Sequence, residues 1–183
     1  MKIQFFGDGA FLLEGKDAKV VLDPSATTKV NKADFVTNSG TAHPAEVKEK
    51  KRVLTVPGEF EISGVLVVGH HIGANNVVYR LVMDEIGLVH FGHLKALPNT
   101  KDLEKLGENF DLIFLVLHEG FKGKMAKDLI ETLEPRMVIL GGDATYFPEM
   151  KEIIGAKTAE ENPLKISKSQ FSDEKTEVLI LPI

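Results

Sequence analysis

The chain has 183 residues, of which 43% are hydrophobic and 27% charged, so it can bury one good core and we expect a single domain spanning residues 1–183. Its formal net charge of -5 argues against nucleic-acid binding, because contacts with a phosphate backbone depend on clustered lysine and arginine. Cysteine is absent, which excludes disulfides and thiolate zinc sites, and no stretch approaches the roughly 20 apolar residues of a membrane span, so we expect a cytoplasmic protein outside the membrane.

Three short strands open the chain and are predicted to pair as an antiparallel sheet. They cover residues 3–6, 10–13 and 19–22. The breaks between them, Gly7-Asp8-Gly9 and residues 14–17, form turns and are too short for crossover helices. A fourth short strand at Phe35 and Val36 runs into a loop of small polar residues, and a helix is predicted from Ala45 to Lys51.

The second half of the chain changes from antiparallel strands to an alternation of helices and strands. Residues 52–91 contain β-branched and aromatic segments separated by turn residues, which indicates a second meander. Beyond it, hydrophobic spacing predicts helices at 101–106, 122–133 and 147–154 and strands at 112–117, 137–140 and 177–181. Strands that are apolar on both faces need cover on both faces, so the predicted fold is α/β, a four-layer αββα sandwich. The polar stretch at 162–172 is predicted to be a mobile loop.

Two features of the predicted strands have a structural interpretation. Glu59 and Glu61 lie two residues apart in a strand and therefore share a face, where charged side chains most often meet solvent. His90 lies in the apolar segment Leu88-Val89-His90-Phe91 and is predicted to be a core histidine rather than a ligand.

Five segments along the chain carry a family pattern. They are Lys2-Ile3-Gln4-Phe5-Phe6-Gly7-Asp8-Gly9-Ala10, Val20-Val21-Leu22-Asp23-Pro24, Pro57-Gly58-Glu59-Phe60-Glu61-Ile62-Ser63-Gly64-Val65, Gly92-His93-Leu94 and Pro135-Arg136-Met137-Val138-Ile139-Leu140. Together they resemble the metallo-β-lactamase-fold hydrolases, in particular the small bacterial and archaeal branch of zinc-dependent hydrolases. The resemblance implies an αββα sandwich of metallo-β-lactamase type and, in the family, hydrolysis at two zinc ions.

The zinc-binding motif of that family is largely absent here. The family motif, Thr-His-x-His-x-Asp-His after a strand, brings three imidazoles and a carboxylate to one loop. The corresponding segment is Thr37–His43, with Asn38, Gly40 and Ala42 at three of the four ligand positions. The bridging aspartate of the family corresponds to His93. The resemblance therefore implies the fold without the ordinary dinuclear site.

Three histidines remain that the fold would bring towards one mouth, His43, His71 and His93. His70 is an alternative to His71, and the two point to opposite faces if their segment is extended. Three neutral imidazoles with an open fourth position suit one zinc, nickel or copper ion. The alternative interpretation is that these are polar rim residues satisfied by water and backbone, with no metal or other cofactor.

Other polar residues are predicted to border the same pocket. His118 and Glu119 follow the strand at 112–117, and Asp143 stands beside Gly142, the position of the last family histidine. The pocket candidates are Asp8, Asn38, His118, Glu119 and Asp143.

Three function hypotheses follow from these residues. The leading one is a catalytically degenerate metallo-β-lactamase-fold protein that binds a small molecule or a protein partner. The second is a metal-dependent hydrolase with one ion at His43, His71 and His93, acting on an ester, amide or phosphoester. The third is an interaction protein that forms a homo-oligomer through an exposed sheet edge or helix face. Neither nucleic acid nor membrane is an expected partner.

Overall fold

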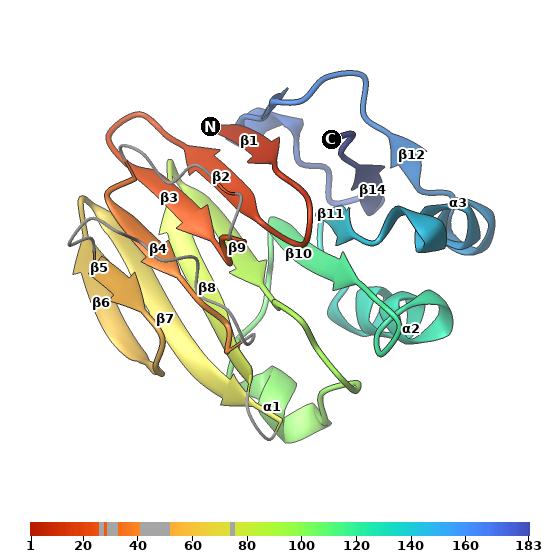
Figure 1. Cartoon of the computed structure of the whole chain (residues 1–183), viewed down its shortest axis with the longest axis horizontal. Coiled ribbons are helices and arrows are strands. Elements are labelled where there is room, and N and C mark those ends of the chain that lie inside the picture. The colour runs from red at the N-terminus through yellow and green to blue at the C-terminus, as the bar shows by residue number, and fades with distance from the viewer. Residues whose placement is uncertain (26–27, 29–32, 41–51, 74–75) are drawn as a thin grey trace.

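Two β-sheets packed face to face form the centre of the molecule (Figure 1). The computed structural model describes residues 1–25, 28, 33–40, 52–73 and 76–183. Within them, sheet A contains β1 (Lys2–Phe5), β2 (Phe11–Glu14), β3 (Lys19–Leu22), β4 (Phe35–Thr37), β5 (Arg52–Leu54) and β13 (Leu164–Lys165). Sheet B contains β6 (Gly58–Ile62), β7 (Val65–Ile72), β8 (Asn76–Met83), β9 (Ile86–His90), β10 (Leu112–Leu117), β11 (Met137–Gly142), β12 (Lys157–Thr158) and β14 (Glu177–Ile180).

Both sheets combine antiparallel and parallel pairing. Sheet A has the order β13-β1-β2-β3-β4-β5, antiparallel as far as β3 and parallel from β3 to β5. Sheet B has the order β12-β14-β11-β10-β9-β8-β7-β6, with an antiparallel meander from β6 to β9 and parallel pairing from β9 to β12. Because β9, β10 and β11 are parallel, the residues that follow them lie at one edge of the sandwich.

The main hydrophobic core fills the space between the sheets. Phe11 packs against Phe5 and Phe114, with ring centroids 5.0 and 4.9 Å apart. All six residues of β10 are buried, since one face of the strand packs on sheet A and the other on the helical layer. Burying each large apolar side chain contributes roughly 2 kcal/mol, so this strand is a main source of stability.

Three helices contribute to the layer on the outer face of sheet B. They are α1 (Thr100–Glu104), α2 (Gly123–Leu133) and α3 (Phe147–Ile154), and Figure 1 shows α2 and α3 beside β10 and β11. The buried side of α2 consists of Ala126, Leu129 and Ile130, at helical spacing. Single turns of 3₁₀ helix, η1 (Ala144–Tyr146) and η2 (Lys168–Gln170), complete the described elements. None of the described helices is long and apolar enough to cross a membrane.

The predicted α/β sandwich is confirmed, since two mixed sheets pack face to face and helices lie on the outer face of sheet B. The helices predicted at 122–133 and 147–154 match α2 and α3 within one residue. The helix predicted at 45–51 lies outside the described residues.

The loop predicted at 162–172 is wrong in part, because this stretch contains β13 and η2. Asn162 Nδ2 donates to the carbonyl oxygens of Phe5 at 3.0 Å and Pro182 at 2.7 Å, and Phe5 N–H donates to Asn162 Oδ1 at 3.1 Å. We call residues 157–176 the strap, since they pair with sheet B through β12 and with sheet A through β13.

Candidate functional site

A buried polar cluster lies where β3, β4 and β9 end. Its members Asp23, Ser39 and His90 are 5%, 0% and 0% exposed. Ser39 donates its backbone N–H to Asp23 Oδ1 at 2.7 Å and its hydroxyl to Asp23 Oδ2. His90 Nε2 lies 3.0 Å from the same Oδ2, an electrostatic contact that is not aligned as a hydrogen bond. The carboxylate of Asp23 thereby joins two segments of sheet A to sheet B.

The surroundings of Asp23 favour its ionised form. Burial alone raises the pKa of a carboxyl group, but attraction to His90 and the hydrogen bonds from Ser39 outweigh it and hold the pKa of Asp23 below its ordinary value. The Ser39 hydroxyl is fully buried and donates to a carboxylate, so no substrate can reach it as a nucleophile. The cluster therefore positions the backbone around the edge of the sandwich where β3, β4, β9 and β10 end, which we call the mouth.

Gly92 lies directly against this cluster. Its φ of 61° belongs to the left-handed region, and a Cβ at this position would overlap Ser39 Oγ and lie 3.0 Å from Asp23 Oδ2. Both the backbone conformation and the lack of space require glycine here.

The segment Thr37–Gly40, where the resemblance would place the first zinc ligands, is bound to the protein itself. The backbone N–H of Asn38 donates to the Leu54 carbonyl at 2.8 Å, and the Ser39 carbonyl accepts from Val77 N–H at 3.0 Å. The Asn38 side-chain oxygen accepts from Gly40 N–H at 2.9 Å, closing a turn within the segment. The side-chain oxygens of Asn38 and Ser39 are therefore engaged in holding the loop, whereas the buried Thr37 hydroxyl has no hydrogen-bond partner among the described residues.

Tyr79 supports this segment from the opposite sheet. Its hydroxyl donates to the Leu54 carbonyl at 2.9 Å and approaches the Asn38 carbonyl at 3.3 Å. Burial, together with the negative charge of Asp23, raises the pKa of Tyr79, so the hydroxyl stays protonated and keeps donating.

His93 and His118 are brought together at the mouth, with ring centroids 5.6 Å apart. His118 Nε2 lies 2.8 Å from the Leu94 carbonyl, which can only accept, and His118 Nδ1 accepts from Gly120 N–H at 3.1 Å. This pattern defines a neutral tautomer with Nε2 protonated and both ring nitrogens in use. His118 is therefore a positioning residue in this structure rather than a free ligand.

His93 has a ring nitrogen that is not satisfied. Its Nδ1 is buried and has no hydrogen-bond partner among the residues that the structure describes. Burial is the main cause that lowers the pKa of His93; Asp23 and Asp8 act in the opposite direction, while His90 and His118 add to the lowering. His93 is thus predominantly a neutral imidazole at neutral pH.

Strand parity separates His70 from His71. Val65 and Val67 point into the core between the sheets, so His71 shares their face, whereas His70 lies on the outer face. His71 pairs with Val77, whose N–H binds the Ser39 carbonyl, and this register puts the exposed His71 at the mouth.

The remaining predicted site residues lie around the rim. Asp8 is exposed in the first turn with φ 49°, and Glu119 is exposed beside the His118–Phe121 bridge. Asp143 caps η1 by accepting from Thr145 N–H and Oγ1 at 2.9 and 2.8 Å, and these hydrogen bonds lower the pKa of Asp143. His43 lies outside the described residues.

No group of three or more histidine, aspartate or glutamate side chains in the described part of the chain is arranged to hold a metal ion.

The buried cluster at Asp23 was not predicted from the sequence, which placed His90 in the core without a partner. One signal was available, since Asp23 follows a buried strand directly and a carboxylate in such a place needs a partner.

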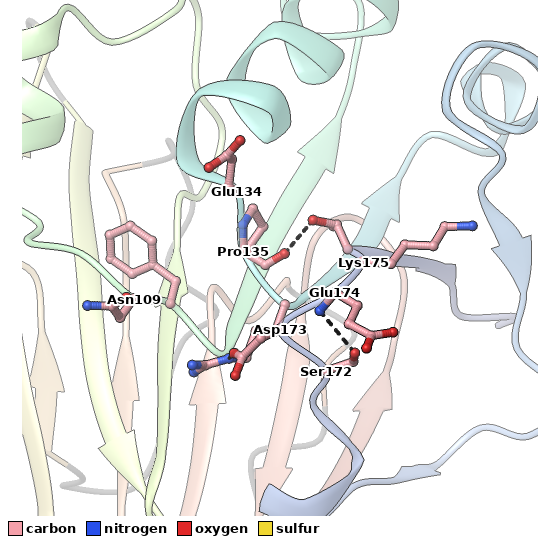
Figure 2. Close-up of a pocket in the computed structure, with 10 residues that line it drawn as sticks. Asn109, Glu134, Pro135, Ser172, Asp173, Glu174 and Lys175 are labelled. Carbon is pink, nitrogen blue, oxygen red and sulfur yellow. Dashed lines mark hydrogen bonds and ion pairs between the residues drawn. The ribbon is translucent and has the colours of Figure 1, made fainter.

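A polar hollow of about 360 Å³ lies at the other end of the same strands (Figure 2). It adjoins Arg136, Glu134 and Asp173, which precede β11 and β14, whereas His118 and Asp143 follow β10 and β11. A six-residue strand spans roughly 20 Å, so this hollow is separate from the mouth.

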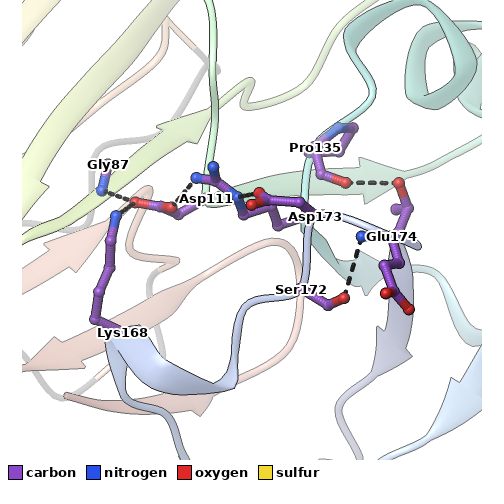
Figure 3. A network of polar contacts seen from close by, with 9 residues as sticks. Gly87, Asp111, Pro135, Lys168, Ser172, Asp173 and Glu174 are labelled. Atoms are coloured by element: carbon purple, nitrogen blue, oxygen red, sulfur yellow. Dashed lines mark hydrogen bonds and ion pairs between the residues drawn. The ribbon is translucent and has the colours of Figure 1, made fainter.

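Two of the charged residues that line the hollow, Arg136 and Asp173, belong to a network of ion pairs (Figure 3). Asp111 accepts from Arg136 Nη1 at 2.6 Å, Lys168 Nζ at 2.5 Å and Gly87 N–H at 2.8 Å. Arg136 Nε also binds Asp173 at 2.5 Å. Burial raises the pKa of Asp111, but the hydrogen bonds from Lys168, Gly87 and Arg136 outweigh burial. The pKa of Asp111 is therefore lower than its ordinary value. We interpret this network as an anchor for the strap.

The fold and the family are shown by comparison with known proteins. Residues 2–140 match the Beta-lactamase superfamily domain, and the chain belongs to this family. Comparison with curated protein sequences gives no match.

Several solved structures share the fold at low sequence identity. One is a Thermotoga maritima protein assigned to the Zn-dependent hydrolases of the metallo-β-lactamase superfamily, with a TM-score of 0.80, 24% identity and 99% coverage of both chains. An isothiocyanate hydrolase from Delia radicum gut bacteria has a TM-score of 0.64 and 10% identity, covering 100% of this chain and 96% of that chain. YhfI of Bacillus subtilis has a TM-score of 0.60 and 11% identity, covering 99% and 96%. These similarities establish the sandwich fold alone.

Proposed function

We propose that this chain is a catalytically degenerate member of the family, which keeps the sandwich and uses its mouth to bind a small molecule or a protein partner. One observation carries the proposal: the side-chain oxygens of Asn38 and Ser39 are engaged within the protein, with Asn38 Oδ1 bound to Gly40 N–H and Ser39 buried on Asp23. The donor set at this position does not fit two zinc ions, since an amide and a glycine stand where the family has imidazoles.

The other rim residues agree with this proposal. Both ring nitrogens of His118 are occupied by backbone groups, and Asp143 is occupied by Thr145. A residue that already satisfies its hydrogen bonds within the protein loses them on binding a metal, which lowers the net affinity.

One observation favours the second candidate, a metal-dependent hydrolase. His93 Nδ1 is buried and without a partner in the described residues, and burial favours the neutral ring that a metal requires. His71 lies at the same mouth, and His43 is the third predicted ligand. A single zinc, nickel or copper ion there would support hydrolysis of an ester, amide or phosphoester.

Metal binding distinguishes the two candidates. We expect elemental analysis of protein purified without a metal-affinity tag to find no stoichiometric metal, and titration with zinc, nickel and copper to leave the melting temperature unchanged. One equivalent of metal that disappears in both His43→Ala and His93→Ala, but persists in the control His70→Ala on the outer face, would overturn the proposal. It would favour the hydrolase and call for activity assays with esters and phosphodiesters.

A further inference from the structure

The outer face of β6, β7 and β8 carries apolar surface that the fold leaves open to solvent. Leu66 and Val82 pair across β7 and β8 and are 46% and 38% exposed. In Figure 1, α2 and α3 lie beside β10 and β11, away from these three strands, whereas α1 lies at the end of β7, where Ile72 and Val78 are buried beside Leu106. The open surface is therefore the part of the face around Leu66 and Val82. A groove of about 190 Å³ runs over this face, lined by Leu66, Val68, His70, Arg80, Val82 and Lys105.

Charges of opposite sign stand on the two sides of this apolar stripe. On β6, Glu59 and Glu61 pair with Val68 and Leu66, share their outer face and are exposed. On β8, Arg80 pairs with Val68 from the other side. Glu59 and Arg80 therefore lie on either side of Val68, at the same position along the direction of β7. The backbone of each is one strand spacing, roughly 4.8 Å, from that of β7.

This arrangement is complementary to itself. We propose that the face binds a second copy of the chain in a symmetric dimer, with the two-fold axis running along β7. Such an axis places β6 of one copy over β8 of the other. Because Glu59 and Arg80 share the level of Val68, each Glu59 then faces Arg80 of the second copy, and Leu66 packs against its own counterpart near the axis.

Arg80 is held in place for such a contact before the second copy arrives. Its Nη1 donates to the Leu106 carbonyl at 2.7 Å, and its Cζ lies 5.9 Å from the ring centroid of Phe110. A side chain that is already ordered loses less conformational entropy on binding. Lys105 on the same side forms an ion pair with Asp102 at 2.6 Å, which leaves Arg80 as the principal cation of the contact.

A second copy fits this face better than a nucleic acid or a membrane does. Glu59 and Glu61 border the apolar stripe and would repel phosphate groups. The open part of β7 runs from Leu66 to His70, roughly 17 Å, because Ile72 and Val78 are buried beside Leu106, and the face is only about three strands wide. An interface of this size corresponds to a weak, reversible dimer.

Charge reversal tests the proposal, with sedimentation velocity over a concentration series as the measurement. We expect a reversible monomer–dimer equilibrium for the wild type. In a dimer of Glu59→Arg, the introduced arginine of each copy would face Arg80 of the other, and in a dimer of Arg80→Glu two glutamates would face each other. The dissociation constant of each variant's homodimer should therefore rise at least tenfold. An equimolar mixture of the two variants should form a heterodimer, because both contacts regain opposite charges. Glu152→Arg on α3 makes the same charge change away from this face and should dimerise as the wild type does.

Arg80→Glu also removes the contact with the Leu106 carbonyl, so a variant that leaves Arg80 intact provides independent evidence. Leu66→Glu places two carboxylates together near the axis and should abolish the dimer. Because Leu66 is only half-exposed and Glu61 lies opposite it, we expect a small fall in melting temperature, with the folded state retained. A wild type that stays monomeric throughout the series overturns the proposal. So does Glu59→Arg or Leu66→Glu if it dimerises as strongly as the wild type.

Discussion

Asp23 connects more of the mouth than any other described side chain. Its carboxylate accepts two hydrogen bonds from Ser39 and contacts His90, so it joins the ends of β3, β4 and β9. Removing one member of a buried, paired group leaves the others unsatisfied, which costs about 3 kcal/mol or more. Asp23, Ser39 and His90 therefore contribute to the stability of the protein and also fix the backbone at the mouth.

We expect Asp23→Asn to destabilise the protein in a pH-dependent way. The pKa of Asp23 is lower in the folded chain than in the unfolded chain, so its contribution to stability is complete above the ordinary carboxyl pKa of about 3.9 and is lost as pH falls through the folded value. The free energy of unfolding should differ by about 3 kcal/mol at neutral pH, and the difference should shrink in acid. Urea denaturation at a series of pH values measures this.

The control for that experiment is Asp17→Asn, which changes an exposed carboxyl group on the same sheet. It should leave the free energy of unfolding almost unchanged at every pH. An Asp23→Asn difference that is constant with pH would show that packing, and not ionisation, accounts for the loss.

Gly92→Ala should destabilise the protein more than its backbone conformation alone requires. An added Cβ meets Ser39 Oγ and must displace the cluster, in addition to the cost of about 1 kcal/mol for a left-handed alanine. Gly155→Ala is the matched control, since Gly155 has φ 66° and nothing within 4 Å of the added Cβ. If thermal unfolding shows the same fall in melting temperature for the two variants, crowding against Ser39 does not contribute to the destabilisation by Gly92→Ala.

At the scale of elements, the strap holds the two sheets together along one edge. It contributes β12 to sheet B and β13 to sheet A, and Lys168 reaches Asp111 of the charged network. Asn162 ties it to β1 and to the last residues through three hydrogen bonds.

Asn162→Ala should therefore loosen the strap while leaving the rest of the sandwich intact. The three hydrogen bonds lost contribute about 1 kcal/mol each. We expect amide hydrogen exchange to accelerate in β1 and β13 but not in β10, which is buried on both faces. Glu160→Ala, an exposed change in the same strap, should leave exchange unchanged. Amide hydrogen exchange that accelerates uniformly throughout sheet B would show that Asn162 does not act locally on the strap.

The regular elements were largely predictable, and the strap was not. The helices α2 and α3 have enough turns for an apolar face to appear in the sequence, and β10 is a continuous apolar run. The strands β12 and β13 have two residues each, too few for any periodicity. Their pairing depends on partners far away in the chain, which local patterns do not reveal.

At the scale of the whole molecule, the sandwich could be predicted because the family pattern runs through most of the chain, from residues 2 to 140 in the matched domain. The site was less predictable for a physical reason. Ligand positions can be compared residue by residue, but the Asp23 cluster depends on Ser39 and His90 meeting from different sheets. The proposed dimer likewise depends on the register of β6, β7 and β8, which aligns Glu59 with Arg80.

The strap also has a consequence for synthesis on the ribosome. In sheet A, β1 lies between β2 and the edge strand β13, and its residues Lys2 and Ile3 pair with Lys165 and Leu164, about 160 residues later in the chain. Until those late residues emerge, one edge of β1 has unpaired backbone groups that can associate with other nascent chains. Slow translation after residue 140 would lengthen that interval. The yield of folded protein is then expected to respond to codon choice there, and to chaperones that cover exposed strand edges.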